Sequence, residues 1–164
     1  IIVPKCLNLC KDPAIRIKLE ALFAMEIFFT DIDEEICLLY VDNILNDIVQ
    51  SLMNDNLQEN IIEAMFSMVE KLALTCGKNF GPYGTKCLEI FTNFLSNIYK
   101  ANTHKEIYGP LLNTICTIGS LCEESFIKFL PDITEFMIQM QNNVTDYNDS
   151  SLFHLQKAWN NMPS

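Results

Sequence analysis

Amide and carboxylate side chains recur in this chain at one repeated spacing. Three segments, aligned on Tyr40, Tyr83 and Phe129, lie 43 and 46 residues apart. Polar residues follow the anchors at steps of 3, 6, 10 and 14: Asn43, Asn46, Gln50 and Asn54; Lys86, Glu89, Asn93 and Asn97; Asp132, Glu135, Gln139 and Asn143. Amides can hydrogen-bond an extended peptide backbone, and carboxylates can pair with Lys or Arg. We call these residues the polar ladder and interpret them as a protein-binding surface.

The spacing of the ladder predicts that each segment is an α-helix, because these steps trace one stripe along a helix. The positions four and eight residues after each anchor are apolar: Ile44, Cys87 and Ile133, then Ile48, Phe91 and Met137. Each helix is therefore expected to have one buried face and one polar face. A second interpretation stays open, since any amphipathic helix shows a solvated polar face without binding anything.

Side chains suited to catalysis or metal binding are scattered. His104 and His154 are 50 residues apart, and neither has a partner at zinc-ligand spacing. The acidic run 31–35 lacks the glycine and terminal glutamate of a calcium loop and is interpreted as a solvated turn. No nucleotide-binding or metalloprotease motif occurs. We expect no enzyme, cofactor or metal; an enzyme of unknown type, with a Cys–His pair, remains as an alternative.

The number of cysteines and the net charge indicate which redox compartment and which binding partners to expect. The chain has seven cysteines and no Cys-x-x-Cys motif, which is typical of free thiols in a reducing compartment. The net charge of −10 disfavours nucleic acid and anionic membranes and permits basic protein partners. No signal peptide or bilayer-spanning run is recognised, and the sequons at Asn143 and Asn148 are expected to be unused.

The elements that must position the ladder are predicted to be helix pairs. Expected helices are 2–10, then the pairs 14–29 with 38–53, 58–76 with 82–99, and 105–122 with 126–142, and finally 151–161. The repeat period is that of HEAT repeats. We therefore predict an all-α, right-handed HEAT-repeat superhelix, a single solenoid over residues 1–164. It has about three complete pairs and partial repeats at both ends, as in a piece of a longer protein.

Short motifs support a family resemblance. Residues 78–83 and 125–131 resemble the Lys-Phe-x-Pro-Tyr helix entry in HEAT repeats of the karyopherin β (importin β) nuclear transport receptors. Residues 114–119 and 137–141 are similar in order and spacing to the middle of the beta-3 branch of that family. The acidic Thr-Asp-Tyr-Asn-Asp loop at 145–149 and the Ala158-Trp159 pair match its continuation, although the family's loop is usually longer and richer in Asp.

The resemblance implies a fragment of a nuclear import receptor that shuttles between cytoplasm and nucleus through the nuclear pore. Such a receptor binds basic protein cargo (nuclear localisation signals, ribosomal proteins or histones) on a concave surface of second helices, and Ran-GTP releases it. In such receptors, Phe-Gly nucleoporins bind between the outer first helices. The apolar residues of the first helices in this chain are instead interpreted as core: Met25, Phe28, Met65, Met68, Leu72 and Ile118. The alternative is a static HEAT scaffold of a phosphatase or chromosome complex, without nucleotide control.

Overall fold

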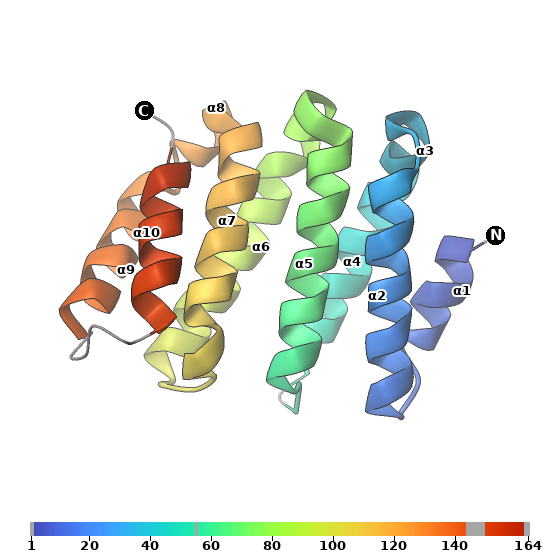
Figure 1. Cartoon of the computed structure of the whole chain (residues 1–164), viewed down its shortest axis with the longest axis horizontal. Helices are drawn as coiled ribbons and strands as arrows, with labels where there is room; N and C mark the ends of the chain where they lie inside the picture. The colour runs from blue at the N-terminus through green and yellow to red at the C-terminus, as the bar shows by residue number, and fades with distance from the viewer. Residues whose placement is uncertain (1, 55, 144–149, 163–164) are drawn as a thin grey trace. The chain divides into compact units, whose positions relative to one another are not determined.

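The structure is a computed structural model that describes residues 2–54, 56–143 and 150–162. Over these residues the chain is all-α, and none of them lies in a β-strand (Figure 1). The predicted all-α class is thus confirmed. The chain divides into two compact units, Ile1–Tyr83 and Gly84–Ser164, which we describe separately. The continuous solenoid stays a prediction, and the acidic loop 145–149 lies outside the described residues.

The first unit holds three long helices and several short ones. They are α1 (Ile2–Leu9), α2 (Ile15–Asp31), α3 (Glu34–Leu38), α4 (Val41–Leu52), α5 (Glu59–Cys76) and the 3-10 helix η1 (Gly77–Phe80). Helices α2 and α5 pack side by side, and α4 lies behind them in Figure 1. Helix α1 packs on α2, and α3 packs on α5 and η1.

The core of the first unit comes from the apolar stripes of these helices. Its fully buried side chains include Met25, Phe29, Ile44, Phe66 and Leu72. Burying a large apolar side chain contributes roughly 1.5–3 kcal/mol, so each of these residues stabilises the unit substantially. Five of the six residues interpreted as core, those other than Phe28, are buried in their units. Phe28 is only half-buried.

Two boundaries in the first unit differ from the predicted ones. Helix α2 runs through Asp31, and the one-turn helix α3 begins at Glu34, so the expected acidic turn shrinks to Ile32 and Asp33. The predicted helix 38–53 is α4, which starts three residues later at Val41. Acidic side chains are favourable in the first turn of a helix, which explains why Glu34 and Glu35 begin α3 instead of remaining in a turn.

The second unit contains most of α6 and the elements that follow it. They are α6 (Gly81–Lys100), η2 (Lys105–Ile107), α7 (Tyr108–Leu121), α8 (Glu123–Phe126), α9 (Leu130–Asn143) and α10 (Ser150–Asn161). Helix α10 packs on α7 and α9. The α-helices α7 and α9 start later than predicted, because Pro110 and Pro131 lie in their first turns, where proline is favoured. Short helices, η2 and α8, occupy the residues before them.

Two close approaches hold the second unit together. A Cβ atom added to Gly84 of α6 would lie 2.5 Å from the Sγ atom of Cys122, and one added to Gly119 of α7 would lie 2.5 Å from the ring of Phe126. Real Cβ atoms do not approach neighbours so closely. Glycine is therefore what permits this packing. Trp159 of α10 remains 40% exposed.

Candidate functional site: a polar groove between α6 and α9

A groove of about 750 Å³ lies between α6 and α9, within the second unit. Twelve residues line it: Thr92, Asn93, Leu95, Ser96, Tyr99 and Lys100 from α6, with Phe129, Asp132, Ile133, Glu135, Phe136 and Gln139 from α9 and the residue just before it. They come from the second helices of two successive predicted pairs. The structure thus brings four residues of the polar ladder into one groove: Asn93, Asp132, Glu135 and Gln139.

The walls of the groove are polar because each helix turns one face toward it. On α6 the polar residues Asn93, Ser96 and Lys100 recur at steps of three and four. On α9, Asp132, Glu135 and Gln139 do the same. Residues at this spacing share one helical face. The walls therefore carry amide, hydroxyl, carboxylate and ammonium groups in a line along each helix.

The floor of the groove is apolar and continuous with the core. Leu95 and Ile133 are each 3% exposed, and Phe136 is 9% exposed. The ring of Tyr99 packs 4.8 Å, centroid to centroid, from that of Phe136 and 5.4 Å from that of Tyr108 on α7. Edge-on aromatic pairs at such distances add roughly 0.5–1.5 kcal/mol beyond simple burial. These ring contacts stabilise the floor.

Hydrogen bonds fix some of the polar side chains around the groove. Gln139 donates from Nε2 to Oε1 of Glu135 over 3.1 Å, and Asn143 donates from Nδ2 to the hydroxyl oxygen of Tyr99 over 3.2 Å. The Glu135 carboxylate is thereby held toward Gln139, and each of its oxygens can still accept a further hydrogen bond. The site therefore presents acceptors to a ligand that brings donors.

All twelve ladder residues are exposed, and the six apolar positions between them are buried. The exposure agrees with the predicted amphipathic faces, while binding by these residues stays a prediction. On α6 and α9 the ladder residues Lys86, Glu89, Asn97 and Asn143 are not among those that line the groove.

Sequence reasoning missed several lining residues, notably Ser96, Tyr99, Lys100 and Phe136. The polar ones carried a usable signal, because Ser96 and Lys100 continue the helical stripe that starts at Asn93. Tyr99 and Phe136 carried no such signal, since an aromatic residue beside a polar stripe is equally compatible with a fully covered core position.

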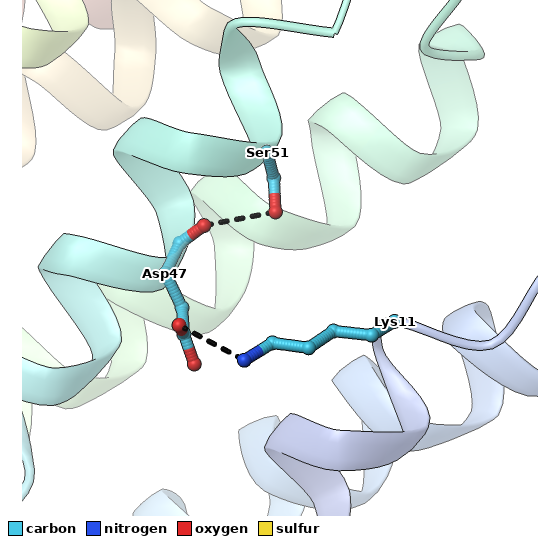
Figure 2. A network of polar contacts seen from close by, with 3 residues as sticks. All are labelled: Lys11, Asp47 and Ser51. Atoms are coloured by element: carbon cyan, nitrogen blue, oxygen red, sulfur yellow. Dashed lines mark hydrogen bonds and ion pairs between the residues drawn. The ribbon is translucent and has the colours of Figure 1, made fainter.

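The part of the ladder in the first unit has a different setting. Asn43, Asn46, Gln50 and Asn54 are exposed on α4 or just after it. The neighbouring Asp47 carboxylate forms an ion pair with Lys11, with Nζ and Oδ1 3.4 Å apart, while the Ser51 hydroxyl donates to the Asp47 carbonyl oxygen over 2.9 Å (Figure 2). A basic residue of this chain is therefore already paired with one of the carboxylates beside the amides.

His154, Cys116 and Cys10 lie in buried or half-buried positions. Nδ1 of His154 lies 2.7 Å from Nδ2 of Asn113 between α10 and α7, and burial together with nearby Lys157 lowers the pKa of His154. Burial raises the pKa of the Cys116 thiol to about 12 and that of Cys10 to about 11. Thiols with raised pKa values are poor nucleophiles at neutral pH. Across residues 2–54, 56–143 and 150–162, no three His, Cys, Asp or Glu side chains gather as metal ligands.

Within the described part of the chain, no helix combines the length and apolarity needed to cross a bilayer. A scan against protein-family models gave no match, and neither did a search of curated proteins.

Proposed function

We propose that the groove between α6 and α9 binds an extended, basic segment of a partner protein. The observation that carries this proposal is the pair of carboxylates, Asp132 and Glu135, which line an open groove together with the amides of Asn93 and Gln139. Peptide recognition combines main-chain hydrogen bonds, which supply affinity, with side-chain contacts, which supply specificity. The groove offers groups for both.

The charge of the partner follows from the charges on the walls. Two carboxylates and one ammonium group, that of Lys100, line the groove, and the whole chain carries a net charge of −10. A long-range negative field attracts basic segments and raises their association rate. The bound segment is therefore rich in Lys or Arg opposite α9 and avoids a basic side chain beside Lys100.

The apolar floor suits the side chains of the same segment. Lys and Arg place their aliphatic stems on apolar surfaces while their charged ends reach polar partners. Tyr99 and Phe136 supply such a surface next to the carboxylates of α9. An Arg guanidinium can also stack on an aromatic ring while it pairs with a carboxylate. The geometry thus favours Arg over Lys at this point.

In the intact protein, we propose that this module belongs to a nuclear import receptor of the karyopherin β type, with Ran-GTP as the signal for cargo release. The support is the resemblance of residues 114–119, 137–141 and Ala158-Trp159 to that family. The second candidate is a static HEAT scaffold, which the helix pairs support equally. Addition of Ran-GTP to the intact protein with its bound ligand distinguishes the two candidates, because only the import receptor releases its ligand.

The groove itself is tested with a fluorescent Arg-rich peptide, and binding is followed by anisotropy. Exposed ion pairs contribute roughly 0.2–1 kcal/mol each, so the double variant Asp132→Asn/Glu135→Gln should weaken binding about 2–30-fold. The matched control is Glu123→Gln/Glu124→Gln, which removes the same charge from exposed residues of α8. Equal weakening by both double variants would show that net charge, and not the groove, attracts the peptide.

A further inference from the structure

The groove carries charges of both signs, and they lie toward opposite ends. Helices α6 and α9 run in the same direction, as the colour gradient in Figure 1 shows. Asp132 lies in the first turn of α9 and Glu135 follows it, whereas Lys100 is the last residue of α6. All three side chains line the groove. The groove is therefore acidic toward the end where α9 begins and basic toward the end where α6 stops.

Contacts between the two helices show which part of α9 lies beside Lys100. Tyr99, the residue before it, packs its ring 4.8 Å from that of Phe136 and accepts a hydrogen bond from Asn143. Both of these partners follow the two carboxylates along α9. Lys100 is therefore level with the part of α9 that lies beyond those carboxylates.

The backbone that carries Lys100 is fixed by a helix cap. Asn102 has a φ of 56°, in the left-handed region, and the Thr103 N–H that follows it donates to the carbonyl oxygen of Ile98 over 3.0 Å. This combination is the Schellman motif, which ends many helices. The Tyr108 hydroxyl donates to the same oxygen over 3.1 Å. The end of α6 is thus well defined, and the Lys100 ammonium group stays within reach of this end of the groove.

The charges in the groove are available to a ligand. Across residues 2–54, 56–143 and 150–162, none of the groups on Lys100, Asp132 and Glu135 forms an ion pair within the chain. Opposite charges that line one groove without pairing can each pair with a group on the bound molecule. A ligand that brings both signs at a matching distance therefore satisfies both ends of the groove, whereas a uniformly basic one places a like charge beside Lys100.

We propose that the segment bound in the groove is dipolar, with an acidic side chain for Lys100 two or three residues away from the Arg that meets Asp132 and Glu135. This inference rests on the proposed binding of a basic segment and names a second requirement of the same site. The two carboxylates precede Gln139, the last lining residue of α9, by seven and four residues, which is roughly 10 and 6 Å along a helix. An extended segment advances roughly 3.3 Å per residue, so two or three residues cover this distance.

The test compares two isomeric fluorescent peptides, blocked at both termini, whose binding to the full chain is followed by anisotropy. Both contain one pair of Arg residues and one Glu, placed about three positions from the Arg pair in the near isomer and about nine in the far isomer. Each is made with the Glu before and after the Arg pair, and the tighter order is used. Net charge is the same in all of them, so long-range attraction cancels. The near isomer should bind about 1.5–5-fold more tightly, the range for one exposed ion pair.

A charge-removing variant assigns the preference to Lys100. Lys100→Gln should abolish the advantage of the near isomer. The matched control, Lys105→Gln, removes the same charge from an exposed residue that does not line the groove and should retain the advantage. A lysine that only stabilises the end of α6 through the helix dipole would change the melting temperature and leave the preference intact, which would overturn the proposal.

The outcomes separate this inference from the proposed function. If the two isomers bind equally while Asp132→Asn/Glu135→Gln still weakens both, the groove binds a basic segment and the acidic partner of Lys100 is wrong. If neither isomer responds to that double variant, the groove does not bind the peptide, and both proposals fail together.

Discussion

The polar face of α4 in the first unit and the groove between α6 and α9 in the second come from the same sequence pattern and differ in chemistry. The α4 face carries neutral amides, and its neighbouring carboxylate, Asp47, is paired with Lys11 of the same chain. In the groove, two carboxylates lie among amides and above an aromatic floor.

The difference shows that a repeated stripe does not imply a repeated chemical environment. The stripe determines which side chains are exposed, because it follows the helical period. Recognition needs two further conditions, namely a second helix that turns its stripe into a groove and carboxylates whose charge is available to a ligand. The groove meets both conditions, whereas on α4 one carboxylate beside the amides, Asp47, is already paired with Lys11.

The largest expected effect comes from a charge placed on the buried face of α6. Phe91 is fully buried and is not among the residues that line the groove, so Phe91→Asp places an unpaired charge in the core of the second unit. The cost should be at least about 3 kcal/mol and should unfold that unit. Thermal melting followed by circular dichroism measures it, with Asn93→Asp, at an exposed position, as the control. Cooperative melting of Phe91→Asp at the original temperature would show that the assigned faces are wrong.

A smaller loss of stability is expected from a single methyl group. Gly84→Ala places a Cβ atom against Cys122 and should destabilise the second unit by roughly 1–3 kcal/mol. Gly81→Ala, one turn earlier in α6, meets no neighbour and should be neutral or slightly stabilising, because alanine favours helices. Denaturant titration of both variants compares them. Equal stability would mean that Cys122 moves aside at little cost.

The amides allow a direct comparison of the two regions. The double variant Asn93→Ala/Gln139→Ala removes side chains that line the groove and should weaken binding of the Arg-rich peptide about 5–150-fold, since each neutral hydrogen bond contributes roughly 0.5–1.5 kcal/mol. Asn46→Ala/Gln50→Ala makes the same change on α4 and should leave the affinity unchanged. Fluorescence anisotropy measures both. An equal loss in the two variants would place the binding surface on the whole ladder.

The smallest expected effects are changes of stability with pH, and they have opposite signs in the two units. The pKa of His154 lies below 6.5, so the unfolded state binds more protons and the second unit loses stability as the pH falls below that value. Burial and nearby Glu59 raise the pKa of Glu63 above 4.5, so the folded state binds more protons and the first unit gains stability as the pH falls from neutral toward 4.5.

Amide hydrogen exchange resolved by unit can follow these changes between pH 7.5 and about 5, a window that spans the ordinary His value. His154→Gln and Glu63→Gln should each flatten the profile of their own unit. If both units respond with the same sign in the parent chain, groups other than these two dominate the pH dependence.

Much of this architecture was predictable from the sequence, and the reasons are visible in particular residues. Ile48, Phe91 and Met137 each follow another apolar residue by four positions, which is the spacing of one helical face, so the buried faces followed directly. Gly81-Pro82 at the start of α6 identified a helix beginning. The short helices α3, η2 and α8 were missed, because one turn contains too few residues to show a period.

The groove was only partly predictable. Asn93 and Gln139 were selected by their spacing, but spacing does not state which two helices approach each other or what lies beneath them. Tyr99 and Phe136 became groove residues through tertiary packing between segments far apart in the sequence. The pairing of Lys11 with Asp47 was unpredictable for the same reason.

Tyr99 has a further consequence for experiment. Its ring lines the groove on one side and packs against Tyr108 and Phe136 on the other, so its environment is asymmetric and closely packed. A segment bound in the groove changes the surroundings of that ring and alters the near-ultraviolet circular dichroism of the tyrosines. The molecule therefore contains its own optical reporter of occupancy, with no added dye.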